Sequence, residues 1–183
     1  MKKAFLIAST IGILGAGGVL VADLAARADD VSAESALAET GAEGNTLYRN
    51  ALRGFSLQYP AEAAVSEFPH PEGAGDVVLF SHPASGFGVQ LVMRPFDEPP
   101  ESISPERIRQ DASGFEVREP QELDLQGEGR GYAFRSGAGE AAVRHLWFVA
   151  HGTLFQLTAP AAFDSEVQKM FSTWRFDPVQ DRS

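Results

Sequence analysis

The feature that most constrains the fold is an apolar stretch near the carboxyl end, residues 141–159. Residues 141–150 read AAVRHLWFVA and are apolar at both odd and even positions. Because successive side chains of a strand point to opposite faces, such a strand must be covered on both sides. His151-Gly152 fits a two-residue turn, since glycine adopts positive φ at low cost. Residues 153–159 (TLFQLTA) then return, so the stretch predicts a hairpin buried inside a layered domain.

A short helix is predicted directly after this hairpin. Pro160 ends the second strand because it has no amide hydrogen to donate. Asp164 is expected to cap the N-terminus of the helix. Apolar residues then recur at helical spacing and form one stripe, which must pack against the neighbouring hairpin. The stripe consists of Phe163, Val167, Met170, Phe171 and Trp174.

Upstream of the hairpin, short apolar segments alternate with turn residues. Seven strands are expected there, at residues 47–52, 55–59, 65–68, 77–81, 88–94, 117–125 and 130–135. The sixth has mixed polarity and belongs near a sheet edge. Ser104-Pro105 begins a helix that ends near Ala112, with Ile103 and Ile108 spaced as a hydrophobic staple. The predicted fold class is α+β, with an antiparallel sheet of about 6–8 strands packed between helices.

Composition excludes several classes of protein. The formal net charge is −10, and no stripe of Lys and Arg is visible, which excludes nucleic acid as a partner. The chain has no cysteine, so it has no disulfides, no cysteine-ligated zinc, no thiol nucleophile and no lipid attached through cysteine. A domain of this size folds without a cofactor, and we expect none.

The amino-terminal residues predict export. Lys2-Lys3 precede an apolar run over residues 4–22, and Ala26-Arg27-Ala28 follows, which is the order found in a secretory signal peptide. The run is also long enough to stay in the inner membrane as an uncleaved anchor. In both cases the folded part lies outside the cytoplasm, in the periplasm or beyond, and only the uncleaved segment would contact a membrane.

Four parts of the chain are expected. Residues 1–28 are the signal peptide or signal anchor, and residues 29–46 are an acidic flexible linker without aromatic residues. Residues 47–178 form a single α+β domain, and residues 179–183 are a tail. We expect the domain to be a monomer.

The histidines give one candidate metal site. His145 lies on the buried strand, where a hydrogen-bonded structural histidine is expected, and His151 is a turn residue. His70 and His82 lie in Pro-flanked loops and could meet in space with Asp76 to hold a metal ion. No local spacing enforces that meeting, so the metal site is a hypothesis.

A Pro-rich acidic loop, residues 95–104, gives the second candidate. It carries Asp97, Glu98 and Glu101, which all lie in one loop and therefore do not form a facing carboxylate pair of glycosidase type. The sequence has no nucleophile-elbow motif and no calcium-loop pattern, so we assign no catalytic residue. Loops on rigid scaffolds often carry recognition, and these carboxylates suit a basic patch on a partner.

Two segments resemble a known family. Residues 48–60 (YRNALRGFSLQYP) are similar to the opening strand pair of PsbP-like domains, and residues 144–176 are similar to their closing hairpin and terminal helix. The family includes photosystem II PsbP proteins, Ran-binding Mog proteins and secreted bacterial proteins of unknown role. The resemblance covers about residues 47–177 and implies an antiparallel sheet between helices and a non-enzymatic, protein-docking role.

Two functions remain open at this point. The first is an exported, non-catalytic PsbP-like module that docks on an envelope protein. The second is a periplasmic protein that binds a small molecule or a metal through the loops around His70, His82 and Asp97. An uncharacterised hydrolase is the least favoured reading, because no catalytic motif is present.

Overall fold

The computed structural model describes residues 44–71, 73–112, 114 and 116–177. The predicted leader (1–28), most of the predicted linker (29–46) and the predicted tail (179–183) lie outside the described residues. Within the described ranges, no helix is long and apolar enough to cross a membrane.

The described strands form two antiparallel sheets. The large sheet has seven strands in the order β3-β4-β5-β9-β8-β7-β6, and the small sheet has three in the order β1-β2-β10. The strands are β1 (Asn45–Asn50), β2 (Phe55–Pro60), β3 (Ala64–Pro69), β4 (Asp76–His82), β5 (Phe87–Pro95), β6 (Arg118–Glu122), β7 (Gly129–Ser136), β8 (Val143–Ala150), β9 (Thr153–Pro160) and β10 (Arg175–Phe176). The two α-helices are α2 (Pro105–Asp111) and α3 (Asp164–Ser172), and short 3-10 helices occur at η2 (Pro100–Ser102), η3 (Gly139–Ala141) and η4 (Ala161–Phe163).

The predicted hairpin lies near the middle of the large sheet as β8 and β9. His151 and Gly152 have φ of 49° and 69°, as a tight primed turn requires. Trp147, Phe148 and Phe155 are 2%, 0% and 1% exposed, and they point to both faces of the sheet. The expectation that this hairpin is covered front and back is therefore confirmed.

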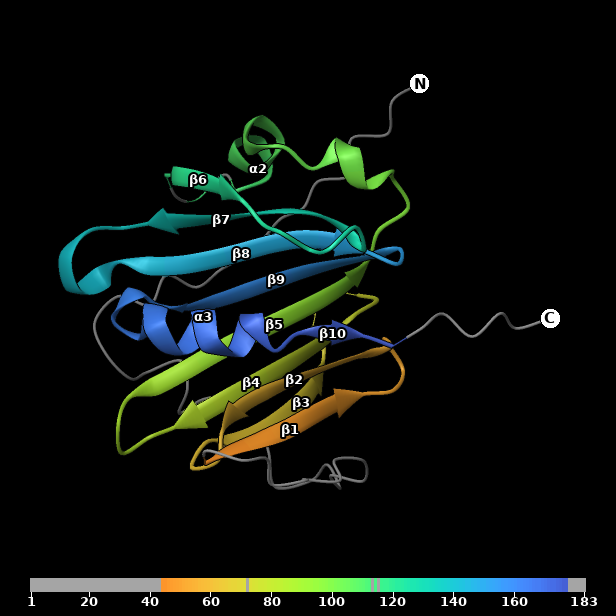
Figure 1. Ribbon diagram of the computed structural model, residues 1–183. Coiled ribbons are helices and arrows are strands. Elements are labelled where there is room, and N and C mark those ends of the chain that lie inside the picture. The colour runs from red at the N-terminus through yellow and green to blue at the C-terminus, as the bar shows by residue number, and fades with distance from the viewer. Residues whose placement is uncertain (1–43, 72, 113, 115, 178–183) are drawn as a thin grey trace.

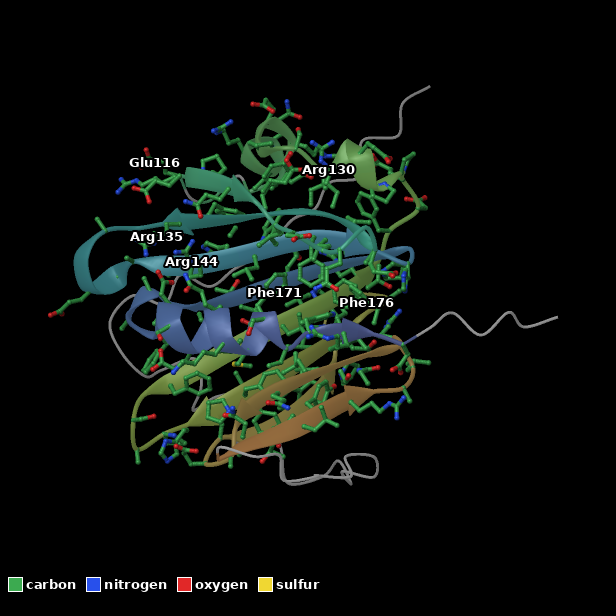
Figure 2. All side chains as sticks on the ribbon, in the orientation of Figure 1. Glu116, Arg130, Arg135, Arg144, Phe171 and Phe176 are labelled. Carbon is green, nitrogen blue, oxygen red and sulfur yellow. The ribbon has the colours of Figure 1, made fainter. Side chains whose placement is uncertain are left out.

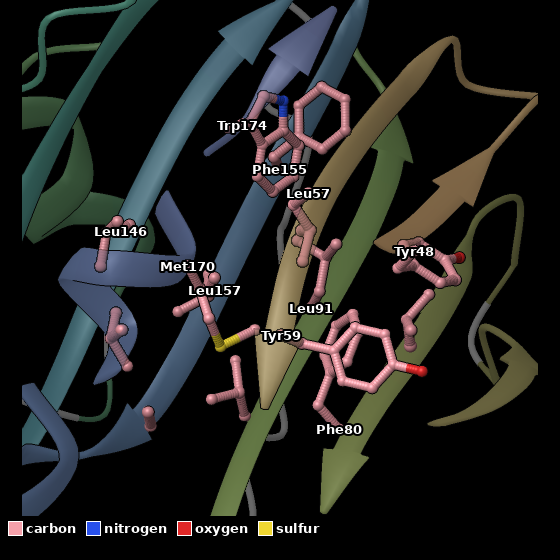
Figure 3. Close-up of a cluster of buried hydrophobic side chains, with 14 of the residues drawn as sticks. Tyr48, Leu57, Tyr59, Phe80, Leu91, Leu146, Phe155, Leu157, Met170 and Trp174 are labelled. Carbon is pink, nitrogen blue, oxygen red and sulfur yellow. The ribbon is translucent and has the colours of Figure 1, made fainter. Parts of the chain in front are cut away.

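The main core lies on one face of the large sheet, which we call the first face. There α3 and the β1–β2 hairpin lie in front of the strands (Figure 1). In the close-up, Tyr48, Leu57 and Tyr59 face Phe80 and Leu91 of the large sheet (Figure 3). The predicted α3 stripe contributes Val167, Met170 and Trp174 to this core, with Phe163 and Phe171 packed partly buried against it.

A smaller core lies on the second face. Ile103, Ile108 and Ala112 from the η2–α2 segment pack against Phe134 and Trp147 of β7 and β8. The Ser104 hydroxyl accepts a hydrogen bond from the Arg107 amide at 3.2 Å, so the predicted cap of α2 is confirmed. The sheet thus lies between helices, as predicted, although α2 covers only the β7–β9 part.

Two details differ from the sequence expectation. The β1–β2 hairpin does not join the large sheet; it pairs with β10 and packs on the first face, because its buried residues alternate strictly and leave one face to solvent. Asp164 is not the cap of α3, since the cap position is Phe163 and Asp164 is the first helical residue. Its carboxylate instead binds two arginines, Arg135 and Arg144.

Candidate docking surface

The structure places the candidate metal residues apart. His70 follows β3 and pairs with Gly75 just before β4, whereas His82 ends β4. The seven-residue β4 separates them by roughly 20 Å at about 3.3 Å per residue. Asp76 is engaged by Arg53 at 2.6 Å. No group of three or more His, Asp or Glu in the described part of the chain is arranged to hold a metal ion.

The acidic loop between β5 and α2 is partly used for internal contacts. The Arg107 side chain contacts Glu98 at 3.3 Å and Asp111 at 2.7 Å. These hydrogen bonds raise the pKa of the Arg107 guanidinium. Asp97 and Glu101 are exposed, and the loop therefore presents two of its three predicted carboxylates to solvent.

His145 has a structural environment. Its ring is 2% exposed, stacks on Phe134 and lies 2.8 Å from the Ser136 hydroxyl and 3.3 Å from the Thr158 hydroxyl. Burial, together with the nearby Arg144 charge, lowers the pKa of His145 to about 4. Ser136 is also buried, so this Ser–His pair is closed to a substrate. The expectation of a hydrogen-bonded structural histidine is confirmed.

The other histidine contacts stabilise turns. His82 Nδ1 lies 2.9 Å from the Ser85 hydroxyl within the β4–β5 turn, and that hydroxyl donates to the His82 carbonyl. His151 Nε2 lies 2.9 Å from Glu128 and its ring contacts Phe176. The first pair lies within one turn, whereas His151 links the β8–β9 turn to the turn before β7 and to β10.

One partly buried carboxylate, that of Asp164, fixes α3 to the sheet. Arg135 and Arg144 are directly opposed on β7 and β8, and their side chains lie next to each other (Figure 2). Like charges at opposed positions repel, so they need a shared anion. Asp164 provides it, with two Arg144 contacts at 2.8 Å and a further contact to Arg135. Arg144 holds the pKa of Asp164 below its usual value.

Several second-face side chains are less buried toward β3 than at β7 and β8, although Val77 on β4 is buried. One cross-strand row runs through opposed residues of six strands: Tyr132, Trp147, Gln156, Val92, Val77 and Phe68. Tyr132 and Trp147 lie under the α2 layer, whereas Val92 and Phe68 are half-buried. The neighbouring row goes from buried Phe134 and His145 to exposed Gln90 and half-buried Leu79.

We call the second face of β3, β4 and β5 the open face. No residue of these three strands belongs to the second core, and among the described residues no helix packs there. At its border, Gln156 is 6% exposed and its Nε2 has no hydrogen-bond partner in the described part of the chain. The open face therefore carries half-buried apolar side chains and borders the buried Gln156 amide on β9.

The two edges of the large sheet also differ. At one edge, β6 contains Pro120 and a register shift between Arg118 and Gln121, with Glu119 at a φ of 49°. Proline, irregular register and charged side chains are the devices that prevent an edge strand from pairing with another chain. The strand 117–125 expected near an edge is thus confirmed as an edge strand, and it is a protected one.

The other edge, β3, has a regular ladder. All six of its residues pair with β4 without a shift. The His70 amide donates to the Gly75 carbonyl at 3.0 Å, and this pair continues the β3–β4 register. Because hydrogen-bonded and non-hydrogen-bonded pairs alternate in an antiparallel ladder, Val65 and Glu67 direct their N–H and C=O groups away from β4. Among the described strands, none pairs with them there.

The sequence did not indicate this surface. The short segment 65–68 predicted β3 without indicating whether it lies at an edge or inside the sheet. The one available signal was negative: residues 61–69 (AEAAVSEFP) contain no Lys or Arg and no internal proline before Pro69. Edge strands usually carry such residues.

Comparison with known proteins agrees with the architecture. No family model matches the chain, and no curated protein matches it. Among solved structures, it is similar to the solution structure of cyanobacterial PsbP (CyanoP) from Synechocystis sp. PCC 6803, with a TM-score of 0.54 at 12% sequence identity. The match covers 76% of this chain and 98% of the CyanoP chain. At that identity the likeness concerns the fold alone: the chain has a PsbP-like fold.

Proposed function

We propose that this protein is an exported, non-catalytic module that docks on another protein of the bacterial envelope. The predicted signal peptide or anchor supports export, and the PsbP-like fold is consistent with an accessory role. The docking surface is the open face of β3, β4 and β5.

The observation that carries this proposal is the change in burial across one continuous sheet. Tyr132, Phe134 and Trp147 on the second face of β7 and β8 are buried, while Phe68, Leu79 and Val92 in the same rows are half-buried. A contiguous apolar patch with a polar rim is typical of a protein interaction site. Arg94 at the end of β5 and Gln90 at its middle supply polar groups beside the patch.

The non-catalytic part of the proposal rests on the histidines and carboxylates. The Ser136–His145 pair is buried, and His82 and His151 are engaged in turn contacts. Glu98 and Asp164 are bound by arginines. General acid–base chemistry needs a titratable group within reach of a substrate, and these groups are used internally.

Crosslinking in intact cells tests the docking function. The full chain, with its leader and a carboxyl-terminal tag, is treated with formaldehyde and purified, and the yield of a discrete higher-mass complex is measured. Leu79→Asp should reduce that yield at least about tenfold, because a carboxylate within an apolar contact is costly. Lys169→Asp, an exposed change on α3, is the matched control and should leave the yield unchanged.

Circular dichroism and thermal melting confirm that both variants fold. A complex that forms equally with Leu79→Asp would contradict the open face as the docking surface. Absence of any discrete complex from the unmodified chain would contradict the docking function itself.

A further inference from the structure

The β3 edge carries an inference about how the partner binds. We propose that an extended segment of the partner protein pairs with β3 as an additional strand of the large sheet, and that this segment alternates basic and apolar side chains. The inference rests on the docking function proposed above, and it specifies the site of contact and the chemistry of the partner.

The backbone of β3 is arranged for strand addition. Val65 and Glu67 direct their amide and carbonyl groups outward, so a new strand can form hydrogen bonds at both residues. Pro69 ends the pairing edge because it has no amide hydrogen. Strand addition obtains affinity from backbone hydrogen bonds and specificity from alternate side chains. The opposite edge, β6, lacks such a regular run.

The two faces of the added strand would meet different surroundings. On the second face, its side chains would lie beside Phe68 and extend the apolar row that continues into Val77 and Val92. An apolar side chain there covers Phe68, which is half-buried in the free protein. Alternate residues of the partner segment should therefore be apolar.

The first-face side chains would lie beside acidic groups. Glu67 is exposed and accepts a hydrogen bond from the Tyr48 hydroxyl at 2.9 Å, and Glu62 lies in the preceding turn. Residues 61–69 contain these two carboxylates and no Lys or Arg. Opposite charges on neighbouring strands stabilise a pair and like charges destabilise it. Lys or Arg side chains therefore suit this face, whereas a second copy of this chain, at a net charge of −10, would add acidic groups.

A peptide series tests the inference on the full chain. The probe is a nine-residue peptide that alternates Lys and Val. The first control has the same composition with its four Val residues contiguous, and the second has the alternating sequence with every second amide N-methylated so that one edge cannot hydrogen-bond. Affinity is measured by isothermal titration, and amide hydrogen exchange is followed residue by residue by NMR.

The alternating peptide should bind and slow exchange at Val65 and Glu67 by at least about tenfold. Both control peptides should bind at least about tenfold more weakly. Val65→Pro removes one outward donor without breaking a bond to β4 and should also weaken binding about tenfold, while Val65→Thr keeps the amide and should bind as the unmodified chain does. Glu67→Gln should reduce affinity by about threefold and retain the preference for the alternating peptide.

Equal binding of the N-methylated peptide would overturn the inference, since only charge attraction would then remain. Protection of Val65 and Glu67 that rises with protein concentration without peptide would assign the edge to a second copy and would also overturn it. If no peptide binds while Leu79→Asp still abolishes the crosslinked complex, strand addition is wrong and the docking function stands. If the complex is also absent, both are wrong.

Discussion

On its β6 side the large sheet is covered on its second face at β7 and β8 and ends in a strand that contains Pro120 and a register shift, whereas on its β3 side that face is open and the edge is regular. Opposed residues of the same cross-strand row pass from buried Trp147 to half-buried Phe68. The β6 half of the sheet contains the second core, and the β3 half carries the open face that we propose as the docking surface.

The largest expected effect comes from truncating one side chain in each half. Phe134 is 0% exposed and lies in the second core, so Phe134→Ala should lower the free energy of unfolding by about 4 kcal/mol. Leu79 lies in the same cross-strand row on the open face, and Leu79→Ala should cost about 1 kcal/mol or less. Chemical denaturation of both variants measures the two losses in free energy of unfolding. Equal losses would remove the distinction between the two halves.

Acidification should lower the stability of the protein through His145 in the β6 half of the sheet. His145 has a folded-state pKa of about 4, below its ordinary value, so the unfolded chain binds more protons between pH 6.5 and 4. Its contribution to stability is fully present above pH 6.5 and declines on acidification through that window, by an amount on the order of 3 kcal/mol. His145→Gln should flatten this part of the stability–pH profile, as measured by urea denaturation. An unchanged slope in the variant would argue against a buried neutral His145.

Proline substitution along β3 sharpens the comparison of edges. Ser66 bonds to β4, so Ser66→Pro should lower the free energy of unfolding by roughly 2–3 kcal/mol. Val65 directs its amide outward, and Val65→Pro should cost about 1 kcal/mol or less. Thermal melts of the two variants make the test. A larger loss at Val65 than at Ser66 would reverse the assignment of outward groups.

A smaller effect is expected from the ion pairs of the β6 half. Asp164→Asn leaves Arg135 and Arg144 opposed without their shared carboxylate, and about 1–2 kcal/mol of stability should be lost. Glu122→Gln removes an exposed pair with Arg130 and should leave the free energy of unfolding nearly unchanged. Arginine hydrogen bonds lower the pKa of Asp164. Its contribution to stability is therefore fully present above the ordinary pKa of an aspartate and is lost as the pH falls through the lowered pKa. Equal losses of stability in Asp164→Asn and Glu122→Gln would contradict the greater burial of the Asp164 pairs.

Much of the fold could be predicted from local pattern. The two-sided apolar strand at 143–150 indicated a covered central hairpin, and Ser104-Pro105 indicated where α2 begins. These signals are local, since they depend on alternation, turn residues and capping. The expected cap of the closing helix at Asp164 was wrong, because the Asp164 carboxylate binds arginines from β7 and β8 and does not cap the helix.

The candidate site could not be predicted in the same way. Only the separation of His70 from His82 has a local signal, because the expected strand at residues 77–81 lies between them. Edge position and the coverage of a face depend on strand order, which is set by long-range pairing. Strand order also explains why β1 and β2, read as part of one sheet, form a separate layer with β10.

Photocrosslinking at the two edges tests the central claim most directly. A photoreactive amino acid replaces exposed Glu67 on β3 in one variant and exposed Glu122 on β6 in another, in cells that produce the full chain. We expect a discrete adduct with a partner protein from position 67 and none from position 122. Adducts from position 122 alone, or equally from both positions, would contradict the claim that β3 is the docking edge.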